Sequence, residues 1–427
     1  MTADELKEIL TASGADAWEL TEKRNHVWEF YFIRHRLDQN RVREVRHLRV
    51  KLFRRSADGR TIGSAGGEIP PTAAAEEAAA AIRGYLTAAA GVHDPAYSLA
   101  GPVPAEPPSG EPIDLRKTAG DLLTVMRSLP ETDAKLVNSY EIFTGVCTTR
   151  FLNSEGIDLT NTAPHSQLEA VLNARSEGHE IELYRMFTMG TCNTEALRAR
   201  LCEALHAGRD KLTARPTPSL GRCDVVFSGE SAPELYRFFT ARMNAAYKVR
   251  GYSDWSEGKA IGELTGDRVT IRAVPFLPDS SENAAFDAEG APIRDTVMIE
   301  DGVARHFLGS RQFSCGLGLT DSFIPGNIVI SGGTASDEAL RRGDYLEAVD
   351  FSDFQVNPLT GDIAGEIRLA YWHHDGVVTP VSGGSVSGSM FDYIRTMRMS
   401  RRQRPFDSFL IPALTRLSGV RLTGAES

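Results

Sequence analysis

Two proline-rich breaks divide this chain of 427 residues into three parts. Residues 101–110 contain four prolines in ten positions, a composition that is typical of a stiff linker. The second break is Arg215-Pro216-Thr217-Pro218. Because proline interrupts helices and central strands, we expect an N-terminal α+β domain at 1–105, a central α+β domain at 111–214 and a mainly β C-terminal domain at 219–427.

The first part combines helices with a strand meander. Residues 4–12 have the pattern of a short helix, and residues 27–55 alternate polar and apolar side chains like strands, with a turn at 57–59. An alanine-rich helix follows. We expect Thr72 to cap this helix and Ala90 to end it.

The central part continues with a helix at 115–129, strands within 133–190 and an amphipathic helix at 194–212. From residue 268 onward short strands dominate, and only 389–399 has a helical pattern. The expected fold class is therefore α+β, with N-terminal α/β sandwich-like units followed by a mostly antiparallel β C-terminal domain.

Residues 231–246 are predicted to form one amphipathic helix. Ser231 and Glu234 have the spacing of a capping box, and Pro233 suits the first turn. The apolar residues of the segment fall on one stripe: Leu235, Phe238, Phe239, Met243 and Ala246. The segment contains no histidine.

Several short motifs follow this helix in a fixed order. They are FDAEG at 286–290, IEDG at 299–302, IPGN at 324–327, NPLTGD at 357–362, AYWHHDG at 370–376, TPV at 379–381 and MFDYI at 390–394. With these motifs the chain resembles the TldD/PmbA (TldE) family from about residue 40 to about residue 420. The histidines at 373 and 374 depart from the family pattern, which leaves their local role open.

The resemblance also bears on the helix at 231–246. In TldD-type members this helix carries a zinc-binding HExxxH. Counting back from Arg250-Gly251, which resembles the family's Arg-Gly after that helix, the motif positions fall on Tyr236, Arg237 and Ala241. Neutral imidazoles hold the zinc and a carboxylate takes a proton from its bound water, which a phenol, a guanidinium and a methyl group cannot do. TldD-type members also supply a cysteine ligand near the C-terminus, whereas the last cysteine here is Cys315.

Because it lacks both the HExxxH residues and the C-terminal cysteine, the chain resembles the metal-free PmbA/TldE subunit of the family. The resemblance then implies that this chain has no catalytic, metal-binding or cofactor-binding residue, and that zinc belongs to a TldD-like, HExxxH-bearing partner subunit. Together the two would form a cytoplasmic metallopeptidase for extended, unfolded peptides, with family roles in peptide-antibiotic maturation and antitoxin turnover. An older family label is modulator of DNA gyrase, but nothing in these residues supports gyrase binding.

Two other classes of function stay open. A self-sufficient hydrolase or metal enzyme would have to use His373 and His374, or Cys202 and His206 at four-residue spacing on a helix. Because consecutive strand residues point to opposite faces, His373 and His374 are not expected to share an ion. His179-Glu180 begins an HExxx string, but it lies in a strand pattern. The third class is a peptide-binding scaffold or regulatory protein without a protease partner.

Composition argues against nucleic acid and membrane as partners. The net charge is -10, with 24% charged residues, which is unlike a dedicated nucleic-acid binder. Residues 23–55 nevertheless carry eleven Lys or Arg against three acids. Because these alternate with apolar residues, we favour the solvated face of strands over a docking patch for a polyanion.

The cysteines and the apolar runs predict a cytoplasmic protein. Five scattered cysteines without a CxxC motif do not form a disulfide framework, which fits a reducing compartment. The start of the sequence is acidic, and no apolar run approaches the roughly eighteen residues of a membrane span. We therefore expect neither export nor membrane insertion.

Overall fold

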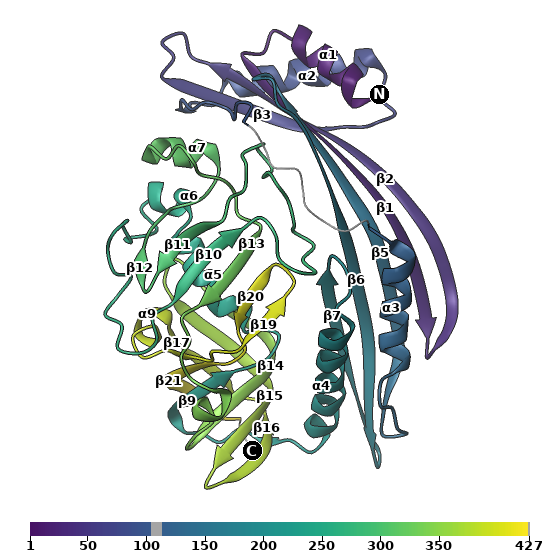
Figure 1. The fold of residues 1–427 in the computed structure, drawn as a ribbon, viewed down its shortest axis with the longest axis vertical. Helices are drawn as coiled ribbons and strands as arrows, with labels where there is room; N and C mark the ends of the chain where they lie inside the picture. Colours follow the sequence, from purple (N-terminus) through teal and green to yellow (C-terminus); the bar gives the residue numbers. More distant parts are fainter. Residues whose placement is uncertain (104–112, 426–427) are drawn as a thin grey trace.

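The computed structural model describes residues 1–103 and 113–425 (Figure 1). A long, curved sheet with helices packed on it forms the N-terminal half, and a β-rich domain lies beside that sheet. Most of the predicted linker at 101–110 lies outside the described residues, so its stiffness stays a prediction.

The N-terminal sheet has seven antiparallel strands in the order β4-β3-β2-β1-β5-β6-β7. The strands are β1 (Ala17–Ile33), β2 (Arg36–Arg55), β3 (Thr61–Ile69), β4 (Asp94–Pro95), β5 (Lys135–Asn153), β6 (Asp158–Ser176) and β7 (His179–Met189). β1 pairs with β2 along its whole length and with β5 from Glu19 to Ile33. Strands from the predicted domains 1–105 and 111–214 thus form one continuous sheet.

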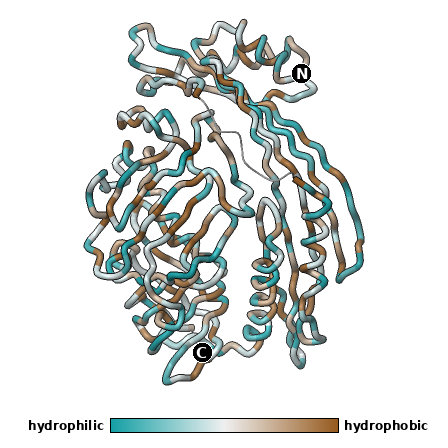
Figure 2. Tube along the Cα trace, viewed as in Figure 1, coloured by the Kyte–Doolittle hydropathy of each residue, from teal (hydrophilic) through white to brown (hydrophobic). Residues whose placement is uncertain are grey.

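Helices on this sheet create two separate cores. α1 (Ala3–Ala12) and α2 (Ala75–Ala90) pack over one end of the sheet, on side chains that include Leu20. α3 (Leu115–Arg127) and α4 (Thr194–Leu212) pack over the other end, around Tyr140. Each core mixes the first two predicted parts, because Leu152 of β5 lies in the first core and Phe32 of β1 lies in the second. Hydrophobic and hydrophilic residues alternate along the long strands in Figure 2, because successive side chains point to opposite faces.

The predicted cap of α2 is wrong. Ala74 occupies the N-cap position and makes no side-chain capping bond. The carboxylate of Glu77 accepts a hydrogen bond from the backbone N–H of Ala74 at 3.0 Å. A first-turn acid thus satisfies a free N–H of the helix start, and Thr72 lies outside the helix.

Two further sheets make up the C-terminal domain. The first has six strands: β12 (Val303–Ala304), β11 (Thr296–Glu300), β10 (Thr270–Val274), β13 (Asn327–Ser331), β20 (Phe409–Pro412) and β19 (Gln403–Phe406). The second contains a closed ring of strands, because its first strand also pairs with its fifth: β14 (Tyr345–Val356), β9 (Gly221–Phe227), β21 (Thr415–Thr423), β17 (Ser385–Ser389) and β15 (Asp362–His374).

β16 (Val377–Ser382) and β8 (Arg215–Pro216) continue the second sheet beyond β15, and β18 (Arg398–Met399) pairs with β21. The parallel neighbours in the domain are β13–β20, β14–β9 and β16–β8, and the other pairings are antiparallel. The predicted fold class, α+β with a mostly antiparallel C-terminal domain, is confirmed.

The helices of the C-terminal domain are short. They are α5 (Pro233–Arg242), α6 (Ala245–Val249), α7 (Arg311–Ser314), the 3-10 turn η1 (Cys315–Leu317), α8 (Asp337–Leu340) and α9 (Met390–Tyr393). The helix predicted at 389–399 is therefore wrong beyond Tyr393. Met399 lies in β18 instead, where the buried Asp267 carboxylate accepts its N–H at 2.7 Å, so tertiary pairing overrides the local pattern. Within residues 1–103 and 113–425, every helix is too short or too polar to cross a bilayer.

A buried carboxyl group lies where the N-terminal sheet meets the C-terminal domain. Next to it, Phe53 and Tyr97 of the N-terminal half pack with Cys315. Glu19 on β1 is only 8% exposed. Burial raises the pKa of Glu19 to about 7. The Lys51 charge opposes this shift, and the side-chain carboxylates of Glu289 and Asp287 in the C-terminal domain add to it.

We predict that Glu19→Gln stabilises the protein at alkaline pH. A pKa raised by folding means that the native state holds the proton more tightly, so stability falls as pH rises from the unfolded value of 4.5 to about 7. The amide carries no charge and avoids this loss, which the shift puts at about 3 kcal/mol at most. Urea unfolding of both proteins at several pH values should show that the variant has the larger free energy of unfolding. This difference should be small at pH 5 and grow toward pH 8. A difference that does not depend on pH would contradict this account of Glu19.

Candidate functional site

The segment predicted as one helix at 231–246 consists of two. α5 ends at Arg242, and α6 begins after Asn244, whose side chain accepts the N–H of Ala246 at 2.8 Å. The predicted capping box is absent, because the backbone carbonyl of Ser231 accepts the N–H of Glu234 at 3.1 Å. The Glu234 carboxylate is turned to Arg237, at 2.9 Å.

The apolar stripe of α5 is buried as predicted. Leu235, Phe238, Phe239 and Met243 have no exposed surface, whereas Ala246 is half-buried. Phe238 and Phe239 meet edge to face, with ring centres 5.4 Å apart. Trp255 lies 5.9 Å from the first ring and 6.1 Å from the second. α5 is thus a core element of the C-terminal domain.

Tyr236, Arg237 and Ala241 occupy the positions that correspond to HExxxH, and their side chains point in different directions. Tyr236 is fully buried, and its hydroxyl lies 2.7 Å from that of Thr415. Burial raises the pKa of Tyr236, so the phenol stays neutral. Arg237 is exposed and stacks over the Phe409 ring at 4.9 Å, besides its pairing with Glu234. Ala241 is half-buried. These side chains form neither a metal site nor a base for activating water.

Arg242, which the sequence analysis did not single out, organises the loops around α5. It is 2% exposed and donates to the carbonyl oxygens of Tyr252 at 3.3 Å and Pro358 at 3.2 Å. It also pairs with Asp254 and stacks over Phe391 at 4.7 Å. The sequence does contain a signal for this role, because Arg242 is a charged residue one helical turn after Phe238 on an otherwise apolar stripe.

The motifs that carried the resemblance fix the backbone. Asp287 of FDAEG is buried and accepts the N–H groups of Ile324 at 2.7 Å, Glu289 at 2.9 Å and Ala291 at 2.9 Å. Burial raises the pKa of Asp287 in spite of these donors. In NPLTGD, Asn357 accepts the N–H of Leu359 at 2.9 Å. These residues therefore build turns.

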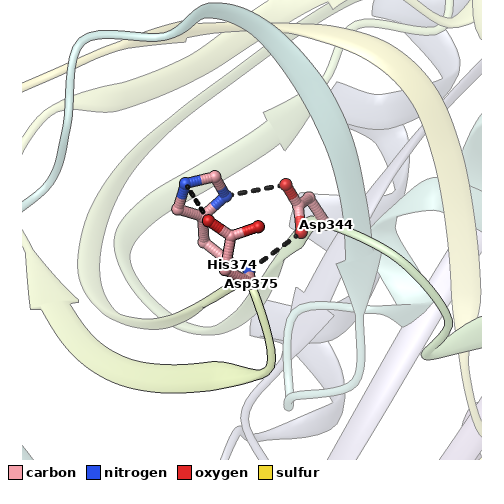
Figure 3. Close-up of side chains that lie close together, drawn as sticks. All are labelled: Asp344, His374 and Asp375. Carbon is pink, nitrogen blue, oxygen red and sulfur yellow. Dashed lines mark hydrogen bonds and ion pairs between the residues drawn. The ribbon is translucent and has the colours of Figure 1, made fainter.

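His374 is held between two carboxylates at the end of β15 (Figure 3). Its Nδ1 lies 2.7 Å from Asp344, and its Nε2 lies 3.5 Å from Asp375. The hydrogen bond to Asp344 raises the pKa of His374, and Asp375 adds to the shift. Asp344, His374 and Asp375 are the group within the described part of the chain whose atoms are close enough to hold a metal. However, the two ring nitrogens point in opposite directions, so one ion cannot replace both contacts. The arrangement suits a protonated imidazole.

The remaining candidates do not converge on this group. His373 points to the other side of the strand and stacks on Tyr345, with ring centres 4.2 Å apart. Burial lowers the pKa of His373. His206 turns its Nδ1 to the carbonyl oxygen of Cys202 at 2.7 Å, and His179 lies exposed on β7. The predicted separation of His373 from His374 is confirmed by these contacts.

The sequence of this chain is similar to one protein family and to proteins of two archaea. Residues 220–424 match the family of PmbA/TldA metallopeptidase C-terminal domains. The chain is 23% identical over 297 residues to a protein from Methanocaldococcus jannaschii, which covers 66% of this chain and 68% of that protein. It is 31% identical over 179 residues to a protein named metalloprotease from Methanothermobacter thermautotrophicus, which covers 40% of this chain and 38% of that protein.

Solved structures share the fold along nearly the whole chain. TldE from Thermococcus kodakarensis superposes with a TM-score of 0.75 at 16% identity, covering 98% of this chain and 100% of that one. A proposed modulator of DNA gyrase from Thermotoga maritima superposes with a TM-score of 0.77 at 18% identity, covering 99% and 100%. The chain thus has an α+β fold that these solved structures share. Residues 220–424 of this chain are similar to the PmbA/TldA metallopeptidase C-terminal domain family.

Replacing Phe239 by Ala should cost about 3–5 kcal/mol of folding free energy, as for other buried aromatic side chains. The ring is fully buried between Tyr236, Phe238 and Trp255, so its loss leaves a cavity in the core. Arg237→Ala, on the exposed side of the same helix, is the control and should change stability by less than about 1 kcal/mol. Chemical denaturation of both variants would test this. Equal losses would show that α5 is not packed as described.

Proposed function

We propose that this chain is a TldE-like subunit without zinc of its own, which pairs with a TldD-like chain bearing HExxxH and forms a peptidase with it. The carrying observation is α5, which keeps a fully buried apolar stripe while Tyr236, Arg237 and Ala241 stand at the motif positions. A catalytic zinc requires three protein ligands and an open position for water. The residues at these positions do not fit that ion, so no step of peptide hydrolysis is assigned to them.

The proposed task of the chain is to complete a chamber and to hold the substrate. Peptidases that act on unfolded chains bind extended backbone, most simply by adding it to a sheet edge. β2 offers such an edge, because β3 pairs only with Leu48–Arg55 and leaves Arg36–His47 paired to β1 alone among the described residues. The substrate would be an unfolded peptide or the precursor of a peptide natural product, in the cytoplasm.

The experiment compares this chain, its HExxxH-bearing partner and their mixture on one unfolded peptide. We predict hydrolysis by the mixture only, with loss of activity on chelation and in a partner whose HExxxH glutamate is replaced by glutamine. Arg237→Ala in this chain should leave the activity of the mixture within a few-fold, because Arg237 lies on the exposed side of α5.

Two results would contradict the proposal. Chelator-resistant hydrolysis by this chain alone would make it a self-sufficient enzyme. Peptide binding without any pairing to the HExxxH chain would instead favour the scaffold function.

A further inference from the structure

At the end of the N-terminal sheet that contains Ile33, α3 and α4 cover one face, and side chains of the opposite face are exposed. Toward Glu19 and Phe151, the C-terminal domain covers that opposite face. The helices pack on side chains such as Tyr140, Leu168 and Phe187. Because successive side chains of a strand alternate between faces, Glu141, Glu169 and Met186 point away from the helices. We call this side of β1, β5, β6 and β7 the outer face.

Two neighbouring rows of side chains on the outer face contain exposed apolar residues at their ends. Strand register places Ile33, Ser139, Val171 and Tyr184 in one row across the four strands. The next row is Tyr31, Glu141, Glu169 and Met186. Ile33, Tyr184 and Met186 are 58%, 52% and 53% exposed. Tyr184 and Met186 lie next to each other on β7, and Ile33 lies at the other end of its row, three strands or about 14 Å away. Exposed apolar side chains at both ends of one sheet face are compatible with a protein-binding surface.

The same rows contain two carboxylates, Glu141 and Glu169, that form no ion pair with another described residue. Glu141 and Glu169 stand directly opposite each other on β5 and β6, where like charges destabilise a sheet. Within the described chain neither forms an ion pair; Glu169 accepts hydrogen bonds from the neutral groups of Gln167 at 2.5 Å and Tyr184 at 2.8 Å. Burial raises the pKa of Glu141, and Glu169 raises it further.

Glu29, a carboxylate on the same face, has the arginine partners that Glu141 and Glu169 do not have among the described residues. Glu29 is 1% exposed and is bound by both Arg41 and Arg43, the latter at 2.7 Å. Arginines of the basic stretch at 23–55 therefore neutralise buried acid on the sheet as well as facing solvent. Because Arg41 is already bound to Glu29, it does not supply the missing partner of Glu141.

We propose that the outer face is the docking surface for a partner subunit that places an Arg or Lys side chain between Glu141 and Glu169, with apolar side chains over Ile33, Tyr184 and Met186. A second copy of this chain does not fit. Two-fold pairing of identical faces would bring both carboxylate pairs together. The inference rests on the proposed function for the identity of the partner, the HExxxH-bearing chain.

The test measures the dissociation constant of this chain and the HExxxH chain by calorimetry at two salt concentrations. Glu141→Lys with Glu169→Lys should weaken binding by at least about a hundredfold, and Glu141→Gln with Glu169→Gln by about tenfold with a smaller salt dependence. The matched control is Glu8→Lys with Glu155→Lys, which makes the same charge change at exposed positions elsewhere and should leave binding unchanged. The Gln variant also removes the like-charge repulsion, so it should melt at a temperature no lower than wild type, and its thermal unfolding separates a loss of binding from misfolding.

The outcomes separate this surface from the proposed function. Tight binding by wild type that the Lys and Gln variants retain would overturn the docking surface and leave the paired peptidase intact. Wild type that does not bind the HExxxH chain would overturn both. Self-association of this chain that the variants abolish would assign the outer face to a second copy, against our inference.

Discussion

The buried rings of Phe238 and Phe239 pack α5 into the core of the C-terminal domain. Hydrogen bonds from α5 then hold the surrounding loops in place. Arg242, the last residue of α5, ties Tyr252 and Pro358 together through their carbonyl oxygens. A buried guanidinium is costly unless its donors are satisfied. Here two carbonyl oxygens and a carboxylate accept from its terminal nitrogens and aromatic rings stack on it, while Nε has no hydrogen-bond partner among the described residues. Whatever stands at the positions of Tyr236, Arg237 and Ala241, α5 is required for the packing of the C-terminal domain.

Local signals predicted most of the elements. The helix at 194–212 has its predicted bounds, because the Asn193 side chain caps its start and its leucines share one face. Features that depend on distant residues were missed. The pairing of β1 with β5 joins two predicted domains into one sheet, and no local pattern in either strand reveals it. The helix at 389–399 stops early because β21 captures Arg398 and Met399.

The sequence predicts the site mainly as a set of positions without metal chemistry, and this stays a prediction. Residue types at 236, 237 and 241 suffice for that inference, whereas the role of Arg242 required the structure. His374 attracted attention in the sequence because imidazole and carboxylate are metal ligands. Its two ring nitrogens face different carboxylates, so the three side chains are held together by ion pairs to the imidazole. FDAEG and NPLTGD mark turns, so motifs that identify a family need not carry its chemistry.

Zinc content tests the central claim most directly. The claim is that this subunit contributes fold and contacts while the metal belongs to its partner. Elemental analysis after dialysis should find far less than one zinc per molecule in this chain alone, and zinc in the complex that is lost when the HExxxH histidines of the partner are replaced. About one zinc per molecule of the isolated chain, removed by replacing His373 and His374, would contradict the account.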